Sequence, residues 1–368
     1  MRILHVITTI NRGGAENHLN DLVHAQRAAG HEVAVAYLKG DGYWAESLAA
    51  IGVPTYALGL GYYGDVRPVA KLAALIRRLS PAVLHAHMPP AEVYSRLALA
   101  LARRKCRYIV SKHNDEPFHH GIGQAWMARW AARRADGIIA ISGAVARFLR
   151  TQGLPADKIR QVHYGLDPIP YGQVAAAQVE AVRQEWGIAR GTMVVGSVGR
   201  LVPQKAMHVL LQGFAQFADA AILPTRLVIV GTGPLEGELR LEARKLGIED
   251  RVVWAGFRTD IAAVMAAFDV FVLTSAWEGF GLVLLEAMAA NRPIVASRIS
   301  AIPEIVAEGE SGFLVDSGAA GQVAAALAKL ADADLRERMG QAGHRRLGQH
   351  FSIGRMMAAT DAVYGLEA

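Results

Sequence analysis

The 368-residue sequence contains a single cysteine, Cys106, and no long apolar run. One cysteine excludes an internal disulfide and any zinc site built from several thiolates, and it fits a reducing compartment. No apolar segment approaches the roughly 18 residues that a membrane span needs, and the N-terminus leads directly into a predicted strand. The sequence also lacks short repeats and low-complexity segments. We therefore expect a cytoplasmic protein, or one bound to the cytosolic face of a membrane.

The glycine fingerprint of dinucleotide-binding domains, G-x-G-x-x-G, is absent after the first predicted strand. The segment there is Asn11-Arg-Gly-Gly-Ala-Glu16, which opens the first predicted helix. The absence of the glycine fingerprint argues against a nicotinamide-dependent dehydrogenase. Gly13 and Gly14 would let a substrate approach the backbone at a helix N-terminus, although an ordinary tight turn explains the pair equally well.

Apolar strands and helical segments alternate along the whole chain, and 52% of the residues are hydrophobic. Near-continuous apolar strands separated by helices predict parallel sheets covered on both faces. The pattern pauses at 162–171, a segment with glycine and prolines, and then resumes. The sequence therefore predicts an α/β protein with two doubly wound, Rossmann-like domains that face each other across a cleft. The predicted domains are 1–168 and 169–350, with a last helix in 351–368 that packs back on the first domain. The predicted strands are 2–8, 32–38, 54–58, 82–87, 107–113 and 137–141, then 193–198, 226–230, 251–255, 269–273, 293–296 and 312–315.

Charge is unevenly distributed over the two halves. Residues 1–165 carry 21 lysines and arginines against 11 acidic residues, whereas the remainder carries 18 against 22. A basic first half predicts an anionic partner for that half. Two basic helical segments, 95–107 and 124–134, combine leucines or tryptophans with arginines and suit an anionic membrane surface. The alternative is two amphipathic helices that cover the sheet.

The most informative segment is Ser275-Ala-Trp-Glu-Gly-Phe-Gly-Leu-Val-Leu-Leu-Glu-Ala-Met-Ala289, which follows a predicted strand and opens a helix. It places Glu278 in the turn and Glu286 in the second turn of the helix. Gly279 and Gly281 let the backbone approach a ligand, and the free N–H groups of the helix N-terminus suit an anion. An anion site beside two carboxylates predicts a nucleoside diphosphate sugar. The alternative is a strand–turn–helix with two solvated glutamates.

A second candidate loop is Gly199-Arg-Leu-Val-Pro-Gln-Lys205, after the first strand of the second half. Arg200 offers a planar fork for bidentate phosphate contact, and Lys205 offers a point charge. Such cations would stabilise the negative charge of a leaving diphosphate. A surface loop with two solvated cations is the alternative. Gly231-Thr-Gly233, after the next strand, is a further close-approach loop or a tight turn.

Histidines mark the ends of two strands in the first half. His113, followed by Asn114, ends the 107–113 strand, where a neutral imidazole could orient a hydroxyl or help to deprotonate it. His85 and His87 share one face of their strand, and with Asn114 they are candidates for lining an acceptor pocket. A metal site built from these two and His119-His120 is disfavoured, because no carboxylate or thiol supports it. Asp332-Ala-Asp334 resembles a metal-binding Asp-x-Asp but lies in a polar stretch, and we predict that it is solvated.

Together, in this order, these motifs make the chain resemble the retaining, GT-B-fold glycosyltransferases of family 4, also called glycosyl transferases group 1. The resemblance covers nearly the full length. Two positions depart from it: Ala206 follows Lys205 where the family often has glycine, and the connector reads His163-Tyr-Gly165 where Asn-Gly is common.

The resemblance implies a role for each matched residue. His113 would contact the transferred sugar, Arg200 and Lys205 would bind the diphosphate, and Glu278 would hold a sugar hydroxyl. Donor-binding residues would be Gly13, Gly14, Gly199, Gly231, Phe280, Gly281, Leu282 and Glu286, with Glu286 on the ribose hydroxyls and the amides of 280–282 on phosphate.

The implied reaction transfers a hexose or N-acetylhexosamine from a UDP- or GDP-linked sugar to a hydroxyl, with retention and without a metal or other cofactor. The leaving phosphate would itself accept the proton of the attacking hydroxyl. The basic half favours a lipid-linked saccharide of cell-envelope polysaccharide synthesis as acceptor. A small soluble acceptor, a nucleotide-sugar epimerase or hydrolase of similar fold, and a binding module without activity are the alternatives. No nucleic-acid partner is predicted.

Overall fold

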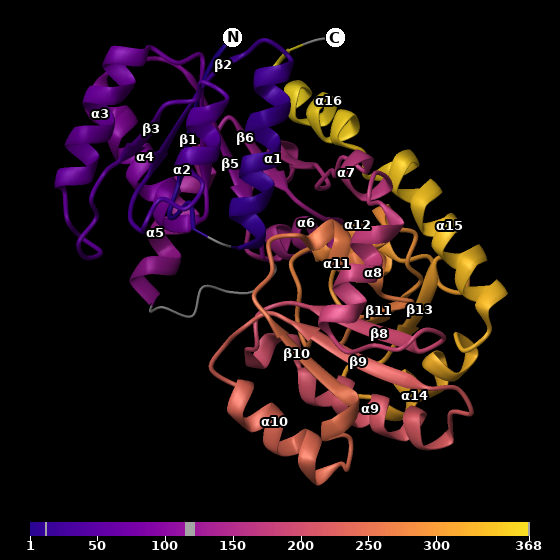
Figure 1. The fold of residues 1–368 in the computed structure, drawn as a ribbon. Helices are drawn as coiled ribbons and strands as arrows, with labels where there is room; N and C mark the ends of the chain where they lie inside the picture. The colour runs from indigo at the N-terminus through magenta and orange to yellow at the C-terminus, as the bar shows by residue number, and fades with distance from the viewer. Residues whose placement is uncertain (12, 115–121, 367–368) are drawn as a thin grey trace. The chain divides into compact units, whose positions relative to one another are not determined.

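The structure, a computed structural model, describes residues 1–11, 13–114 and 122–366. The chain forms two compact units: unit 1 is Met1–Gly165 with Ile353–Ala368, and unit 2 is Leu166–Ser352. Each unit contains one parallel sheet with helices on both faces (Figure 1). The predicted α/β fold with two doubly wound domains is confirmed. No helix within the described residues is both long and apolar enough to cross a membrane.

The sheet of unit 1 has seven parallel strands in the order β3-β2-β1-β4-β5-β6-β7. The chain starts at β1, winds outward to β3 and then returns to β4 on the other side of β1, so the winding direction reverses between β1 and β4. Ligands of open parallel sheets bind at the carboxyl ends of the strands at such a reversal. The strands are β1 (Arg2–Ile7), β2 (Glu32–Tyr37), β3 (Thr55–Ala57), β4 (Val83–His87), β5 (Arg107–Lys112), β6 (Gly137–Ala140) and β7 (Ile159–Gln161).

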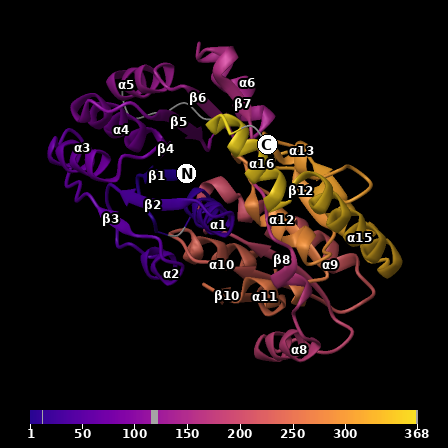
Figure 2. The same cartoon turned by 90° about the horizontal axis from the view of Figure 1, so that it is seen from above.

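Two layers of helices cover the sheet of unit 1. In Figure 2, α3, α4 and α5 lie along one face, and α1 and α16 lie along the other. The last helix, α16, thus packs in unit 1, against α1, β5 and β6, although it follows the whole of unit 2 in sequence. The helices are α1 (Gly14–Ala28), α2 (Ala45–Ala50), α3 (Arg67–Leu79), α4 (Pro89–Ala102), α5 (Ile122–Arg133), α6 (Gly143–Thr151), η1 (Ala156–Lys158) and α16 (Ile353–Tyr364).

Unit 2 repeats this plan with six parallel strands in the order β10-β9-β8-β11-β12-β13, and here the winding direction reverses between β8 and β11. The strands are β8 (Met193–Val198), β9 (Thr225–Val230), β10 (Val252–Gly256), β11 (Val270–Leu273), β12 (Ile294–Ser297) and β13 (Gly312–Val315). The helices are α7 (Ile169–Gly172), α8 (Ala176–Glu185), η2 (Pro203–Lys205), α9 (Met207–Ala220), α10 (Glu236–Lys245), η3 (Glu249–Arg251), α11 (Ile261–Ala267), α12 (Leu282–Ala289), α13 (Ile302–Ile305), α14 (Ala320–Lys329) and α15 (Ala333–His350).

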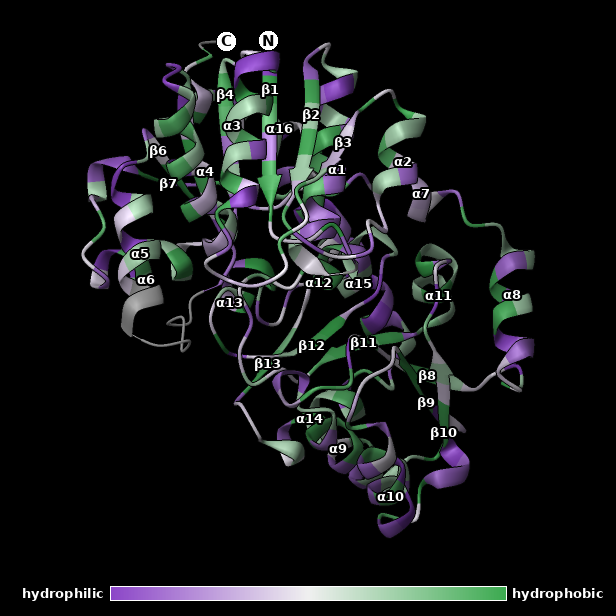
Figure 3. Ribbon diagram, turned by 90° about the vertical axis from the view of Figure 1, so that its left-hand side faces the viewer, coloured by the Kyte–Doolittle hydropathy of each residue, from purple (hydrophilic) through white to green (hydrophobic). Residues whose placement is uncertain are grey.

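Burial explains why these segments form strands and helices. The central strands are buried on both faces and are mostly hydrophobic in Figure 3, apart from buried polar residues such as His5 on β1, whereas the helices are striped. Such strands can be stable only between two helical layers. In unit 2 one hydrophobic cluster packs the apolar sides of α9 and α14 against β8, β9 and β11. Helix α15 begins where it does because the Asp332 carboxylate accepts hydrogen bonds from the amides of Asp334 and Leu335.

Two sequence predictions need correction. The strand β7 was not predicted, because only Ile159 of its three residues is buried and the apolar signal is therefore absent. The predicted basic helix 95–107 ends earlier, at Ala102, where Arg103 adopts a left-handed conformation with φ of 51°. The basic residues 103–105 therefore lie in the exposed turn after α4, not on the helix.

Candidate functional site

Two loops of unit 2 meet where the winding of its sheet reverses. One follows β8 and carries Lys205, and the other follows β11 and carries Glu278; the two strands are hydrogen-bonded neighbours. The Lys205 ammonium donates to Glu278 Oε2 at 2.6 Å, and both side chains are about nine-tenths buried. The structure thus brings together two predicted site residues that are far apart in sequence.

Three polar residues that the sequence prediction missed hold these loops together. Thr274 donates to the carbonyl oxygens of Lys205 and Ala206, at 3.3 and 3.2 Å. Gln204 donates its side-chain amide to the Trp277 carbonyl at 3.1 Å. Ser275 donates to the same Glu278 oxygen that Lys205 binds, at 3.1 Å. Ser275 precedes Glu278 by three residues in the predicted motif, so their contact could have been predicted from the sequence. The contacts of Thr274 and Gln204 depend on tertiary packing and could not.

The glycines of this region are needed for close packing between loops. A Cβ on Gly231, which has a φ of 132°, would overlap the Gly199 carbonyl oxygen, and one on Gly233 would overlap the Leu201 carbonyl. Gly231 also donates its amide to the Gly256 carbonyl at 2.7 Å. The Gly231-Thr-Gly233 loop therefore packs directly against the backbone of the 199–205 loop, whether or not it contacts a ligand.

Helix α12 begins shortly after Glu278, in the same segment that follows β11. Gly281 precedes the helix with a φ of 92°, a value that favours glycine, and no side chain caps the helix. The amides of Gly281 and Leu282 at this helix start therefore have no side-chain cap, and their contact with an anion stays a prediction. Phe280 is buried, and Glu286 is partly buried in the second turn.

Arg200 projects from the loop after β8 as an exposed side chain. Within the described residues its guanidinium makes no hydrogen bond or ion pair. An exposed arginine on the same loop as Lys205 offers two donors to a phosphate oxygen pair. The local geometry of unit 2 therefore suits a diphosphate.

Unit 1 carries a different chemistry at its own reversal point. His5 on β1 pairs in register with His85 on β4, and Ile7 pairs with His87. Strand alternation places His5, His85 and His87 on one face of the sheet, and all three are buried. Burial lowers the pKa of His5 to about 4 and the pKa values of His85 and His87 well below the ordinary range. These imidazoles are therefore neutral at physiological pH.

His113 follows β5 and joins this cluster. Its Nε2 lies 3.3 Å from His87 Nδ1, and its Nδ1 lies 2.5 Å from the Tyr164 hydroxyl. The ring is partly buried; burial first, and the Lys112 ammonium second, lower the pKa of His113 to about 3. Lys112 itself is paired with the buried Glu92 carboxylate at 2.5 Å. Both ring nitrogens of His113 have protein partners, so a sugar could bind them only by displacing one. A direct sugar contact from this ring stays a prediction.

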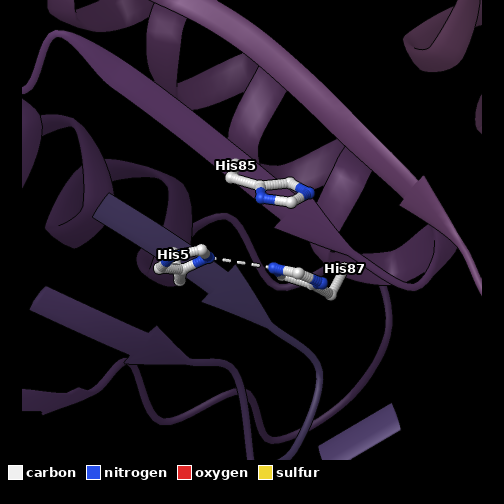
Figure 4. Close-up of side chains that lie close together, drawn as sticks. All are labelled: His5, His85 and His87. Carbon is white, nitrogen blue, oxygen red and sulfur yellow. Dashed lines mark hydrogen bonds between the residues drawn. The ribbon is translucent and has the colours of Figure 1, made fainter. Parts of the chain in front are cut away.

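His5, His85 and His87 lie close enough to be considered as a metal site, with one ring nitrogen from each within 4.8 Å of the others (Figure 4). However, all six ring nitrogens already have hydrogen-bond partners. The His5–His87 bond of 3.0 Å is drawn in Figure 4, and His85 lies 2.7 Å from both Ser111 and Tyr364. A metal ion would have to replace this network. The cluster is therefore better described as a hydrogen-bonded core than as a metal centre.

The remaining candidates of unit 1 lie near the start of α1 and the end of β5. A Cβ on Gly13 would collide with the Glu16 carboxylate, which folds back and accepts from Thr9 at 2.6 Å. Glu16 thus places a negative charge at this helix N-terminus. Gly14 has open space around it, and Asn114 is exposed. His119 and His120 lie outside the described residues.

Comparison with known proteins agrees with this geometry. The family described as Glycosyltransferase Family 4 matches residues 12–169, and Glycosyl transferases group 1 matches residues 178–346. The chain is 30% identical over 279 residues to the alpha-maltose-1-phosphate synthase of Mycolicibacterium smegmatis. The aligned region covers 70% of this chain and 72% of that protein. It is 28% identical over 358 residues to the lipopolysaccharide core biosynthesis glycosyltransferase LpsE of Rhizobium meliloti, with 97% and 96% covered.

Among solved structures, the Anabaena protein HepE in complex with UDP-glucose is 26% identical and superposes with a TM-score of 0.89 over the full length of both chains. Two parallel-sheet units, both family matches and this superposition agree over the whole chain. The chain therefore belongs to the family-4 glycosyltransferases of GT-B fold, and it is a glycosyltransferase that acts on a nucleotide sugar.

Proposed function

We propose that this glycosyltransferase transfers a hexose or N-acetylhexosamine from a UDP-linked donor, with a GDP-linked donor as the alternative, to a hydroxyl of a lipid-linked saccharide. The observation that carries the proposal is the arrangement at the reversal point of unit 2. Lys205 and Glu278 pair between the loops that follow β8 and β11, α12 starts without a side-chain cap shortly after Glu278, and Arg200 is exposed on the same loop as Lys205. The complex of the similar HepE protein with UDP-glucose supports UDP as the nucleotide.

Each donor group has a proposed partner in this arrangement. The diphosphate binds Arg200, Lys205 and the amides of 280–282, which stabilise the charge that develops as the phosphate leaves. Glu278 binds a hydroxyl of the sugar, and Glu286 binds the ribose hydroxyls. Protein cations and helix amides supply positive charge at the phosphate, so we propose that the transfer needs no metal.

We further propose that the anomeric configuration is retained. Glu278 is held by both Lys205 and Ser275 through one carboxylate oxygen, which suits a hydrogen-bonding role better than attack on the anomeric carbon. The leaving phosphate then takes the proton of the attacking hydroxyl on the same face of the sugar. Proton NMR of the product linkage, compared with the α-linked donor, tests retention directly.

A thermal-shift measurement tests the donor site. A nucleotide that binds only the folded protein stabilises it by about 2.7 kcal/mol at a hundredfold excess over its dissociation constant. We expect UDP to raise the melting temperature in the presence of a chelator, and we expect Arg200→Ala to abolish most of the rise. Arg190→Ala is the matched control, because Arg190 is exposed and precedes the opposite end of the same strand, β8. If neither UDP nor GDP stabilises the protein, the proposed donor site is wrong.

For the acceptor, we propose that unit 1 binds an anionic membrane surface that presents a lipid-linked saccharide. The side chains of Leu97 and Leu101 on α4 are 43% and 48% exposed, and the turn after α4 exposes Arg103, Arg104 and Lys105. Apolar side chains next to a basic turn favour adsorption to anionic lipids. The relationship to LpsE supports an envelope saccharide as the acceptor.

Co-sedimentation with vesicles tests this surface. Vesicles of phosphatidylcholine with phosphatidylglycerol should retain the protein, whereas pure phosphatidylcholine vesicles should not. The double variant Arg103→Glu, Arg104→Glu should lose this binding, and Arg190→Glu in unit 2 should keep it. Equal binding by all three proteins would contradict the proposal. Transfer to water-soluble sugars alone, with no polyprenyl-linked product, would favour the small-acceptor alternative.

A further inference from the structure

Five side chains of unit 1 form one continuous chain of hydrogen bonds that runs from Tyr164 through His113 to Gln26. The Tyr164 hydroxyl lies 2.5 Å from His113 Nδ1, and His113 Nε2 lies 3.3 Å from His87 Nδ1. His87 Nε2 then lies 3.0 Å from His5 Nδ1, as Figure 4 shows. Finally, His5 Nε2 lies 2.8 Å from the side-chain oxygen of Gln26 on α1. We call this set the histidine chain.

All hydrogen bonds of the histidine chain donate in the same direction, from Tyr164 toward Gln26. A neutral imidazole carries one N–H and one lone pair, so each ring must donate at one nitrogen and accept at the other. The Gln26 oxygen only accepts, and His5 must therefore carry its proton on Nε2. His5 Nδ1 then accepts from His87, His87 Nδ1 accepts from His113, and His113 Nδ1 accepts from Tyr164. All three rings are consequently in the Nε2–H tautomer.

The orientation of one amide decides this direction. The Gln26 amide nitrogen donates to the Tyr364 hydroxyl at 3.3 Å, and Tyr364 is the last residue of α16. Tyr364 in turn lies 2.7 Å from His85 Nδ1, and His85 Nε2 lies 2.7 Å from Ser111. If the Gln26 amide turned over, its nitrogen would face His5, and every hydrogen bond along the histidine chain would have to reverse.

We propose that Gln26, His5 and His87 are positioning residues that hold His113 in its Nε2–H tautomer, with its Nδ1 lone pair facing Tyr164. In this state the ring nitrogens of His113 are not a base for the acceptor hydroxyl, because one carries the proton and the other is occupied. The significance of the tautomer for sugar transfer rests on the proposed function together with the contact between His113 and the transferred sugar that the family resemblance implies, but the tautomer itself does not.

The first test is the tautomeric state of each histidine in the whole protein, read from long-range ¹H–¹⁵N spectra at about pH 8, above the ordinary histidine pKa. His5, His87 and His113 should all show the Nε2–H pattern. Two other histidines provide an internal reference: His24 and His344 face backbone carbonyl oxygens through Nδ1, at 2.8 and 3.2 Å, and should show the opposite pattern. An Nδ1–H pattern or a mixture at His113 would overturn the proposal.

The second test removes the amide at the far end of the histidine chain. Gln26→Leu should shift the tautomer populations of His5, His87 and His113 together, because it removes the acceptor that fixes the proton on His5 Nε2. Asn20→Leu is the matched control: it removes a carboxamide from the same helix, and the Asn20 oxygen has no partner among the described residues. A His113 spectrum that stays unchanged in Gln26→Leu would refute the coupling.

Tyr364→Phe provides a second test if Gln26→Leu does not fold. This variant keeps the Gln26–His5 hydrogen bond and removes only the hydroxyl that orients the Gln26 amide. It should produce both tautomers at His113, while the His24 and His344 signals stay in place. In a transfer assay Gln26→Leu should lower kcat about tenfold or more through misplacement of His113, with the shift produced by UDP unchanged. An unchanged kcat would refute the positioning role, whereas absence of any UDP shift in the native protein would instead refute the proposed donor site.

Discussion

Mild acid should unfold unit 1 far more readily than unit 2. His5, His18, His85 and His87 are all at least nine-tenths buried in unit 1. Burial lowers the pKa of His5 to about 4, and it lowers the pKa values of the other three well below the ordinary range. In the unfolded chain each would return to a pKa of about 6.5. The unfolded state therefore binds more protons, and the stability that these groups contribute is present above pH about 6.5 and is lost as pH falls toward the folded values.

The magnitude follows from the shift of four groups. Between about pH 7.5 and about pH 5.5, each histidine that titrates only in the unfolded state lowers the free energy of unfolding by about 1.4 kcal/mol, so the four together lower it by about 5 kcal/mol. A typical domain has a total of about 5–15 kcal/mol. Glu92 acts in the opposite direction, because burial raises the pKa of its carboxyl, although the Lys112 charge limits that rise. The net loss should still remove much of the stability of unit 1.

Unit 2 is the internal control, because its histidines, His208, His344 and His350, are not buried. Urea unfolding can be followed separately in the two units. A variant with Trp186, Trp254 and Trp277 replaced by phenylalanine reports only on unit 1, and the complementary variant reports only on unit 2. Calorimetry in buffers of different ionisation enthalpy then counts the protons taken up on unfolding.

We expect unit 1 to take up about 3.6 protons at about pH 5.5 from these four histidines and about 0.9 from His113, whose pKa burial lowers to about 3. Its urea midpoint should fall steeply over this pH range, while that of unit 2 should fall little. An uptake below about two protons, or equal losses in the two units, would refute the reasoning that these rings are buried and neutral.

Three further substitutions test local features. Ala206 adopts a left-handed conformation with φ of 44°, so Ala206→Gly should stabilise unit 2 by about 1 kcal/mol, measured by its urea midpoint. Gly231→Ala should destabilise unit 2 by about 3 kcal/mol or more and weaken UDP binding, because the new Cβ would overlap the Gly199 carbonyl; unchanged stability would contradict the close packing. Glu92→Gln should cost unit 1 about 3 kcal/mol, because the Lys112 ammonium would stay buried without a counter-charge, and a loss below about 1 kcal/mol would show that Lys112 reaches solvent.

The sequence predicted the strands well wherever a strand is buried and therefore consists of consecutive apolar residues. Runs such as Met193–Val198 are apolar on both faces and can hardly be anything but a central parallel strand. The short strand Ile159–Gln161 was missed, because two of its three residues are exposed. Lys205 and Glu278 were each predicted from loops after strands, but their ion pair depends on β8 and β11 being neighbours, which the sequence order does not state.

The histidine chain shows where sequence reasoning stops. Strand alternation predicted that His85 and His87 share a face, and the same rule applied to β1 would have added His5. Gln26 and Tyr364 could not have been added, because they are 338 residues apart and meet only when α1 and α16 pack side by side on the sheet. His113 alone suggested a group that contacts substrate, but its partners Tyr164 and His87 make it an internal member of a hydrogen-bonded network.

The two reversal points differ in charge, and this difference bears on where the basic surplus of the first half acts. At the reversal of unit 1 the imidazoles are neutral, Lys112 is neutralised by Glu92, and Glu16 already places a carboxylate at the start of α1. A diphosphate would gain little there, whereas the reversal of unit 2 offers Arg200, a lysine and an uncapped helix. The surplus positive charge of unit 1 instead lies on exposed surface, as in the turn after α4. A charge placed there favours attraction of an anionic surface over binding of a phosphate in a pocket, and the vesicle experiment measures this difference.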